Sequence, residues 1–380
     1  MKRAAALLAA LVAALPGAAT GPPAPADGPL AHVAGDFTPN DTAGSRLAGS
    51  WARVQWNFAG PHGVKAPAAW TNLERAGAPG GAGVVVAVLD TGVAYADRPP
   101  FRRSPDLDPA TFVPGYDFVS DDPYPLDLHG HGTHVASTIA EQTNNGIGLT
   151  GLAYGAKLMP VRVLDGTGTA DAPTIARGVR FAADRGAKII NLSLNFAGSV
   201  TAEQIPELID AMEYAYGHGS LVVAAAGNQG VPAVAYPARA DHVLAVGATT
   251  ESGCLSAFSN TGPQLDLVAP GGGRDAWIRD RACLPGRRGR PIYQITLARR
   301  RVDRFAMSGR FVGTSMAAAH VSAIAALVVA SGVLGPDPSP EAIAERLTRT
   351  AHDLGAPGYD VRYGWGLVDA GAATAPPASR

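Results

Sequence analysis

Residues 83–92 are Gly83-Val84-Val85-Val86-Ala87-Val88-Leu89-Asp90-Thr91-Gly92, an unbroken apolar run that ends in a carboxylate and a glycine. A short apolar run without polar alternation is typical of a strand that is buried on both faces, as in a parallel sheet. Similar runs follow at residues 157–164, 187–193, 220–226 and 243–247. The stretch therefore predicts the first strand of a sheet inside the protein.

Helical patterns lie between these runs. Residues 172–185 form one, and residues 201–216 form another with Thr201 as a candidate N-cap. Ser339-Pro340-Glu341 opens a last helix, with proline in its first turn. Strands that alternate with helices predict an α/β fold with a mostly parallel central sheet and helices on both faces. We expect one such domain over residues 51–373.

The N-terminus carries a secretion pattern. Lys2 and Arg3 precede an apolar run over residues 4–15, and small residues follow it. This order is typical of a signal peptide, and the run is too short to span a bilayer as a helix. We expect a signal peptide over residues 1–19, with cleavage as late as residue 26, and a flexible arm over residues 20–50. The protein is thus predicted to be secreted (extracellular or periplasmic) without a membrane span; a buried N-terminal helix is the alternative.

Composition and charge exclude several classes of protein. The chain has 380 residues, of which 47% are hydrophobic, and it contains 46 Gly and 31 Pro. These values exclude a wholly disordered chain and a coiled coil. The formal net charge is −1, but residues 274–310 contain eleven Arg and three Asp, so the rest of the chain carries −9. A balance near zero excludes a uniformly basic protein, and we expect no nucleic-acid partner.

Cys254 and Cys283 are the only cysteines in the chain. Export to an oxidising compartment favours a disulfide between them. Two buried free thiols are the alternative, because the sequence does not give the distance between the two Cα atoms.

Reactive side chains follow several of the predicted strands. In parallel sheets, catalytic and ligand-binding residues lie beyond the carboxyl ends of the strands. Asp90 ends the first run, and Asn228 follows the run at 220–226, where its amide could donate to a developing oxyanion. Ser315 follows Gly313 at the start of a helix of small residues, where the helix end is positive. Each residue alone has an ordinary explanation as a turn or cap residue.

Three histidines, His129, His131 and His134, lie within six residues. Their spacing resembles the zinc cluster of metallo-β-lactamase-like hydrolases, but Thr133 stands where that cluster needs an aspartate. The other interpretation is one catalytic imidazole, His131, at the start of a helix. With Asp90, Asn228 and Ser315 it would complete the set of groups that acyl transfer requires.

Taken in order, these motifs resemble those of subtilisin-like serine proteases (subtilases, peptidase family S8). Asp90-Thr91-Gly92, residues 131–136 and residues 313–317 match the three signatures, and the resemblance covers residues 55–370. It implies a three-layer subtilisin-like fold and a monomeric serine endopeptidase that acts on proteins or peptides. It assigns Ser315 as the nucleophile, His131 as the general base, Asp90 as the group that orients the imidazole, and Asn228 as the oxyanion donor.

The resemblance also places substrate contacts. Gly166, Thr167 and Gly168 would pair with the extended backbone of a substrate. Two facing segments would form the wall of the primary specificity pocket; their residues are Ser193, Leu194, Asn195, Ala225, Ala226 and Gly227. Asn195 stands where the family usually has glycine, so the cleavage specificity stays open.

A structural Ca²⁺ site is implied in the same way. Its ligands would be the carbonyl oxygens of Thr143, Ile147 and Leu149 together with side-chain oxygens of Asn145, Asp106 and Gln55. Oxygen-only ligands suit a hard cation. An ordinary polar loop is the alternative.

The chain departs from the family pattern in two respects. Only the arm separates the expected signal peptide from the domain, and it lacks the strand–helix pattern of a folded propeptide. An Arg-rich insertion over residues 272–310 leads directly into Ser315. We hypothesise that this insertion favours acidic substrates or anionic surfaces, the alternative being a solvated loop. A non-catalytic binding protein with the same fold is the remaining alternative function, although all four catalytic positions are occupied.

Overall fold

The structure is a computed structural model that describes residues 9–11, 37–278, 283, 286 and 288–376. The predicted signal peptide and arm lie outside the described residues except for 9–11 and 37–50. Three arginines of the insertion, Arg279, Arg281 and Arg287, also lie outside them.

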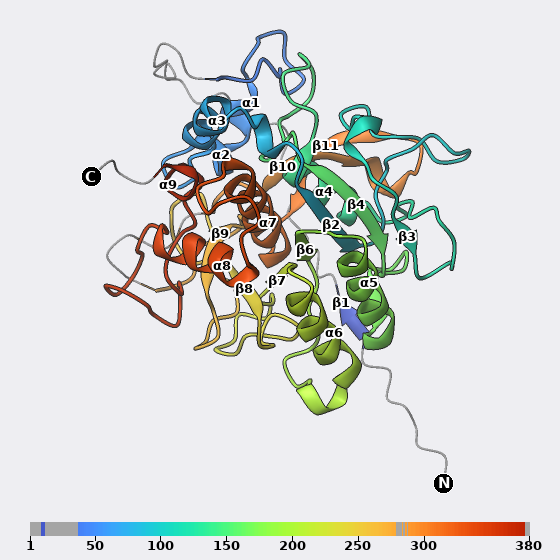
Figure 1. The fold of residues 1–380 in the computed structure, drawn as a ribbon. Coiled ribbons are helices and arrows are strands. Elements are labelled where there is room, and N and C mark those ends of the chain that lie inside the picture. The colour runs from blue at the N-terminus through green and yellow to red at the C-terminus, as the bar shows by residue number, and fades with distance from the viewer. Residues whose placement is uncertain (1–8, 12–36, 279–282, 284–285, 287, 377–380) are drawn as a thin grey trace.

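A seven-stranded sheet forms the centre of the molecule (Figure 1), and every neighbouring pair of strands in it is parallel. The strands, in spatial order, are β3 (Tyr116–Asp117), β4 (Lys157–Arg162), β2 (Val85–Asp90), β6 (Ile189–Leu192), β7 (Leu221–Ala225), β8 (Val243–Thr249) and β9 (Leu267–Pro270). The five predicted apolar runs coincide with β2, β4, β6, β7 and β8 to within two or three residues at their ends, which confirms the α/β fold. The sequence did not predict β3 or β9.

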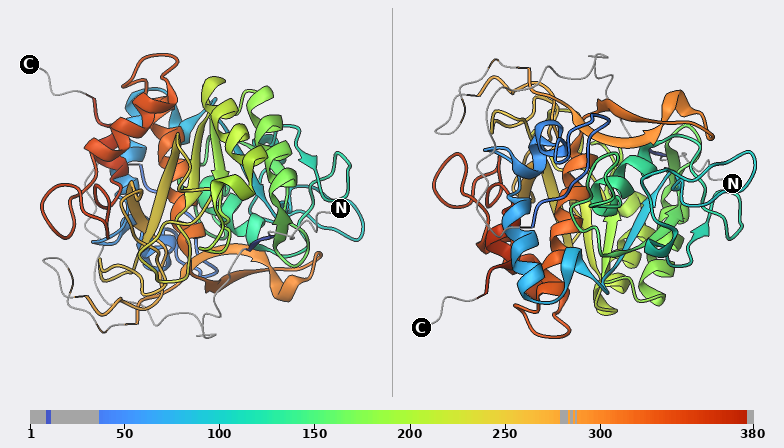
Figure 2. Two further views of the ribbon diagram at one scale, coloured as in Figure 1. Left: turned by 90° about the horizontal axis from the view of Figure 1, so that it is seen from below. Right: turned by 90° about the horizontal axis from the view of Figure 1, so that it is seen from above.

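Helices cover both faces of this sheet (Figure 2). On one face lie α3 (Ala66–Arg75), α4 (His131–Ala140) and α7 (Thr314–Ser331), and on the other lie α5 (Ala172–Asp184) and α6 (Pro206–Gly217). Side chains of β2 alternate between the two cores: Val86 and Val88 face the first, and Ala87 and Leu89 face the second. Because both faces are buried, the strand sequence is apolar throughout instead of alternating.

Helix α7 runs through the first core. Among the helices that the structure describes, it alone is long and apolar enough to cross a membrane, and 83% of that stretch is buried inside the protein. Its composition therefore reflects its position against the sheet.

The other described helices are short, apart from α8, which has ten residues. They are α1 (Trp51–Val54), α2 (Trp56–Ala59), α8 (Pro340–Arg349), α9 (Ala370–Thr374) and the 3₁₀ turns η1 (Pro79–Gly81), η2 (Pro109–Thr111), η3 (Ala202–Gln204) and η4 (Ala298–Arg300). Ser339 caps α8 by accepting from the amide of Ala342, yet α8 is not the last helix, because α9 follows it. The predicted helix over 201–216 is divided into η3 and α6, since Pro206 starts a new helix.

Residues 37–50 pack on the domain instead of belonging to a flexible arm. Phe37 stacks on Tyr154, with ring centroids 5.4 Å apart, and the Trp51 indole donates to the carbonyl of Pro39 at 3.0 Å. Asp41 is fully buried. The boundary that we expected at residue 51 is therefore too late, because aromatic packing and a buried carboxylate hold the preceding segment.

The second half of the Arg-rich insertion is a two-stranded antiparallel hairpin, β10 (Ile292–Leu297) and β11 (Phe305–Phe311). It lies against α4, where Ser137 Oγ donates to the carbonyl of Ile295 at 3.1 Å. A disulfide joins Cys254 to Cys283, whose Cα atoms are 4.9 Å apart, and ties the first half of the insertion to the turn after β8. The hairpin half of the insertion is therefore a packed element and not a solvated loop.

A separate pair of strands lies beside α5. Strand β1 (Ala9–Leu11) pairs antiparallel with β5 (Thr169–Asp171), with Ala9 opposite Asp171 and Leu11 opposite Thr169. The edge of β5 therefore accepts an extended segment of the chain.

Candidate active site

The four predicted catalytic residues lie at the ends of core elements. Asp90 is the last residue of β2, His131 is the first residue of α4, Ser315 is the second residue of α7, and Asn228 follows β7. All four side chains are buried. The parallel sheet places these ends on one side of the molecule, as expected for the carboxyl edge of an α/β sheet.

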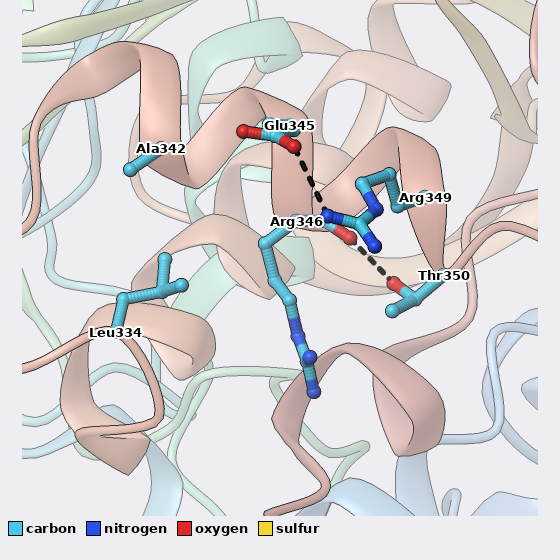
Figure 3. Close-up of a pocket in the computed structure, with 6 residues that line it drawn as sticks. All are labelled: Leu334, Ala342, Glu345, Arg346, Arg349 and Thr350. Carbon is cyan, nitrogen blue, oxygen red and sulfur yellow. Dashed lines mark hydrogen bonds and ion pairs between the residues drawn. The ribbon is translucent and has the colours of Figure 1, made fainter. Parts of the chain in front are cut away.

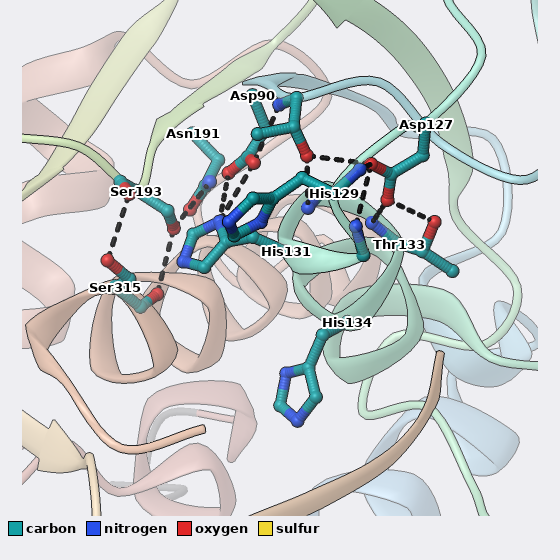
Figure 4. Close-up of polar contacts among 12 residues, drawn as sticks. Asp90, Asp127, His129, His131, Thr133, His134, Asn191, Ser193 and Ser315 are labelled. Carbon is teal, nitrogen blue, oxygen red and sulfur yellow. Dashed lines mark hydrogen bonds and ion pairs between the residues drawn. The ribbon is translucent and has the colours of Figure 1, made fainter. Parts of the chain in front are cut away.

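Asp90 holds the imidazole of His131. Nδ1 of His131 lies 2.8 Å from Oδ1 and 2.9 Å from Oδ2 of the carboxylate, and the two side chains are 2% and 0% exposed. A hydrogen bond to a carboxylate keeps the proton on Nδ1, which leaves Nε2 free to act as a base. In Figure 4 the imidazole lies between Asp90 and Ser315.

Gly132 lets the start of α4 approach β2. A Cβ atom at this position would clash with the carbonyl oxygen of Gly92 and would lie 3.0 Å from the Cβ of Asp90. A larger residue would thus push His131 away from the carboxylate, which explains the glycine that follows this histidine.

Ser315 is bonded to the residue that follows β6. Its Oγ donates to the carbonyl of Ser193 at 2.9 Å, and the Ser193 hydroxyl donates to the carbonyl of Ser315 at 2.8 Å (Figure 4). The amide of Asn191 donates in turn to Ser193 Oγ at 2.9 Å. These contacts fix the position of α7 relative to the sheet.

The amide of Asn228 is oriented with its donor unused. Its Oδ1 accepts from the backbone amide of Thr314 at 2.8 Å and from the Thr314 hydroxyl at 3.0 Å. Its Nδ2 is buried and has no partner within the described part of the chain. A buried donor without an acceptor is rare, and its place beside Gly313 suits a group that stabilises a transient negative charge.

Asp127 is a site residue that sequence reasoning missed. Its carboxylate accepts from the amides of His129, Gly130 and Thr133 at 2.8–3.0 Å and from the hydroxyls of Thr91 and Thr133. It therefore joins the turn before α4 to the end of β2. The available signal was an aspartate just before a Gly-containing turn, which is typical of a side chain that caps nearby amides.

The residues that build this site belong to a stretch with known relatives. Residues 81–366 match the sequence profile of the Subtilase family. The chain belongs to this family. It is 36% identical to thermitase of Thermoactinomyces vulgaris over 273 residues, which are 72% of this chain and 82% of thermitase. It is 38% identical to subtilisin Savinase of Lederbergia lenta over 298 residues, or 77% of this chain and 91% of Savinase.

A solved structure agrees with these relatives. A protease from Pseudoalteromonas arctica superposes with a TM-score of 0.69 and 30% identity, covering 89% of this chain and 99% of that protein. The chain is thus a subtilisin-like serine endopeptidase with the subtilisin-like fold.

The three neighbouring histidines of this subtilase have separate partners. His134 is fully buried, its Nε2 donates to the carbonyl of Ile292 at 3.1 Å, and burial lowers its pKa to about 3. His129 accepts from Arg300. Across the described ranges, no group of three or more His, Cys, Asp or Glu residues is placed to hold a metal ion. The histidine cluster therefore gives the zinc interpretation no geometric support.

The predicted substrate segments follow strands β4, β6 and β7 of the central sheet. Gly166, Thr167 and Gly168 lie in a turn that Asp165 holds, and the strand that follows them is β5. Leu194 belongs to the core beneath α5 and α6. Ala225 is the last residue of β7, and Ala226 and Gly227 follow it. The side-chain amide of Asn195 donates to the carbonyl of Phe196 at 2.8 Å.

The predicted calcium loop meets two buried carboxylates. Asp106 accepts from Asn145 Nδ2 at 2.7 Å and from the Leu149 amide at 2.9 Å. Asp41, which was not predicted, accepts from the amides of Asn144 and Asn145 at 2.9 and 3.1 Å. Burial raises the pKa of Asp106 to about 7 and also raises the pKa of Asp41. Two buried acids beside a loop of carbonyl oxygens fit a divalent cation.

Gln55 is bonded to Thr150, the residue that directly follows this loop. Its Nε2 donates to the carbonyl of Thr150 at 2.7 Å, and its Oε1 accepts from the Thr150 amide at 3.0 Å. The side-chain oxygen of Asn145 likewise accepts from a backbone amide, that of Ile147 at 3.0 Å, and Asp41 adds a carboxylate at the loop.

Two cavities lie away from Ser315. One, of about 290 Å³, is lined by Asp106, Ile147, Ile295 and Met307 among others, between the calcium loop and the hairpin. The other, of about 270 Å³, lies on α8 and is lined by Leu334, Ala342, Glu345, Arg346, Arg349 and Thr350 (Figure 3). Neither is lined by a predicted catalytic residue.

Proposed function

We propose that Asp90, His131 and Ser315 form the catalytic triad of a secreted serine endopeptidase and that Asn228 stabilises the oxyanion. The observation that carries the proposal is the buried hydrogen bond between Asp90 and His131, next to the N-terminus of α7. The neutral imidazole that this bond orients is the base that a serine hydroxyl needs.

The geometry supports the following reaction. Ser315 Oγ attacks the carbonyl carbon of the scissile peptide bond while His131 Nε2 accepts the hydroxyl proton. The carboxylate of Asp90 stabilises the imidazolium, and Asn228 Nδ2 donates to the oxygen on which negative charge develops. The imidazolium then protonates the leaving amine, which gives an acyl-enzyme ester. Water, activated by the same imidazole, hydrolyses this ester and frees Ser315.

Covalent labelling with a fluorophosphonate tests this assignment. We expect one label on Ser315, and no label and no peptidase activity in Ser315→Ala. His131→Ala should also lose labelling, whereas Ser339→Ala, at the cap of α8, serves as a matched serine control and should be labelled like the parent protein. A folded protein that is neither labelled nor active would instead support the non-catalytic binding function.

An extended peptide would bind along β5. The pairing of β1 with β5 supports this binding mode, because it is strand addition at this edge. Residues Gly166, Thr167 and Gly168 would lead the substrate backbone to the edge. The wall of the primary pocket would be formed by Ser193, Leu194, Asn195, Ala225, Ala226 and Gly227.

A Ca²⁺ ion would stabilise the loop over residues 143–149. Asp106, Asp41 and the side-chain oxygens of Asn145 and Gln55 would hold it together with the carbonyl oxygens of Thr143, Ile147 and Leu149. The ion would neutralise two carboxylates that burial leaves with raised pKa values.

Secretion is supported by the N-terminal pattern and by the disulfide between the only two cysteines. N-terminal sequencing of the protein recovered from the culture medium tests it. A mature start at residue 20 or 27 is expected, and retention of Met1 on intracellular protein would contradict the proposal.

A further inference from the structure

The hairpin of the Arg-rich insertion reaches His131. Its strand β11 ends at Phe311, whose ring lies 5.9 Å from the ring of His131 between centroids, and four residues later the chain reaches Ser315. At the other end of the hairpin, the tip brings Arg300 next to His129. Both ends of the hairpin thus border the site.

Arg300 and His129 are joined by a hydrogen bond. Nη2 of Arg300 lies 2.9 Å from Nε2 of His129, and since a guanidinium can only donate, the imidazole nitrogen must accept. His129 is therefore neutral, with its proton on Nδ1. Burial, followed by the charges of His131 and Arg300, lowers the pKa of His129, which agrees with this state. The rings of His129 and His131 are 6.4 Å apart between centroids.

This contact is not arranged for stability. His129 is 6% exposed, and its Nδ1 is buried without a partner among the described residues. Arg299 and Arg300 both have positive φ angles, 53° and 58°, a conformation that is unfavourable for residues with a side chain. Unsatisfied donors and strained backbone of this kind gather at functional sites.

The charge of Arg300 has no counterion within the described part of the chain. Other arginines of the insertion do: Arg290 pairs with Glu251, and Arg301 pairs with Asp303. Arg300 is exposed, and the side chain that it contacts is a neutral ring. The guanidinium therefore keeps free donors that are held in place one side chain away from the imidazole of His131, so that less conformational entropy is lost when an acceptor arrives.

We infer that Arg300, positioned by His129, is a specificity-determining residue that selects substrates with a carboxylate side chain next to the scissile bond. The inference rests on the proposed function and names its substrate class. A carboxylate would accept from the free guanidinium donors of Arg300, a charge-assisted contact that the amide isostere makes only weakly. Asp or Glu should thus be preferred over Asn or Gln at one position adjacent to the cleaved bond.

Matched peptides test this inference. Quenched peptides that carry Glu or Gln at each position flanking the cleaved bond are compared by kcat/KM, at low salt and at ~0.5 M NaCl. At the selected position we expect a Glu/Gln ratio of about ten in the parent enzyme, which is the order of one charge-assisted hydrogen bond. The Glu/Gln ratio should fall to about one in Arg300→Gln. In Arg300→Glu it should fall below one, and a matching peptide with Lys at that position should be cleaved faster than the Gln peptide.

Arg304→Gln is the matched control, because it removes the same charge from an exposed position of the same hairpin. A ratio within about twofold of the parent in Arg304→Gln is expected for a local contact. An equal loss in both variants would show diffuse steering and overturn the inference. Arg300→Lys keeps the charge and loses the planar fork, so it should give an intermediate Glu/Gln ratio. Such a graded result would show that the loss in Arg300→Gln does not come from misfolding.

Failure of the inference is distinct from failure of the proposed function. If the parent enzyme cleaves both peptides and labels on Ser315 but shows a Glu/Gln ratio near one at every position, the role of Arg300 is refuted and the triad stands. If the parent enzyme cleaves neither peptide and Ser315 is not labelled, the triad assignment fails.

Discussion

Ser315 and Ser193 exchange two hydrogen bonds, each from the hydroxyl of one residue to the backbone carbonyl of the other, at 2.9 and 2.8 Å. The proposed nucleophile is therefore held next to the end of β6 in the free enzyme, and its hydroxyl must turn toward His131 before it can react. Catalytic hydrogen bonds are often made only when a substrate is bound. The same exchange fixes α7 to the sheet.

Ser193→Ala should weaken this attachment. Loss of the hydroxyl removes two hydrogen bonds, one donated to the carbonyl of Ser315 and one accepted from the amide of Asn191, so we expect the free energy of unfolding to fall by about 2 kcal/mol. We also expect kcat/KM to fall severalfold because the start of α7 is less well held. Ser322→Ala is the control: Ser322 bonds Asn191, one step further from the nucleophile. Equal rate losses in the two variants would contradict a specific role for Ser193.

Asn228→Ala should lower kcat by about 10²–10³, the range known for removal of the corresponding donor in subtilisin. KM should change little, because the donor acts on charge that develops in the transition state. The stability of the variant is a further readout, since the amide also accepts from Thr314. A loss of kcat below about threefold in a stable variant would remove Asn228 from the oxyanion site.

Asp127→Ala should be among the most damaging substitutions outside the triad. It leaves three buried amides and two hydroxyls without their acceptor, and we expect a loss of roughly 2–4 kcal/mol in the free energy of unfolding. Asp127→Asn keeps one acceptor oxygen and should retain part of the stability and activity. Chemical denaturation followed by fluorescence measures the first effect, and kcat/KM on a neutral peptide measures the second. Wild-type stability in Asp127→Ala would show that the turn before α4 does not depend on this carboxylate.

His320 should make the protein sensitive to acid. It is fully buried in α7, its Nε2 accepts from Asn57 at 2.8 Å, and burial lowers its pKa from 6.5 to about 4. Between these two pH values the unfolded chain binds a proton at this residue and the folded chain does not, so stability falls as the pH falls through this window. The contribution is about 3 kcal/mol.

The test is the slope of the unfolding free energy against pH between about 4 and 6.5. His320→Leu should be less stable at neutral pH but should lose less stability on acidification, by the equivalent of one proton. His218→Leu, at an exposed histidine, should leave the slope as in the parent. An unchanged slope in His320→Leu would contradict the prediction.

Chelation of calcium should lower the melting temperature. Without a cation, Asp106 and Asp41 are two buried carboxylates near one another, and the pKa of Asp106 is raised to about 7. We expect EDTA to lower Tm by several degrees and added Ca²⁺ to restore it, with a much smaller EDTA effect in Asp106→Asn. A melting temperature that EDTA does not change would favour the ordinary polar loop.

Local signals predicted most of the fold and the candidate catalytic set. Continuous apolar runs identified β2, β4, β6, β7 and β8, because a strand that is buried on both faces is apolar at nearly every position. Asp90, His131 and Ser315 lie in segments whose glycines and small residues are themselves required by close packing. These features need no knowledge of distant contacts.

Long-range contacts account for what the sequence did not predict. Asp41 acts through the distant amides of Asn144 and Asn145, and Asp127, whose amide partners are local, also joins these to Thr91 at the end of β2. The partner of His129 is Arg300, 171 residues further along the chain. The hairpin β10–β11 was not predicted, because most arginines of the insertion lie outside its strands and the strands pack on α4, a contact that the sequence does not show. Segment 37–50 was placed in the arm because its composition does not show that aromatic rings of the domain cover it.

The pairing of β1 with β5 has a kinetic consequence. A peptide that adds at the edge of β5 must displace a segment of the same chain, whose local concentration does not fall when the enzyme is diluted. Because residues 9–11 belong to the proposed signal peptide, this competition applies to the uncleaved precursor, which should show a higher apparent KM for long extended peptides than the mature form that begins at residue 20 or 27, with the same kcat and with no dependence on enzyme concentration. Removal of the N-terminus would thus free the edge of β5 and lower the concentration of extended substrate that hydrolysis requires.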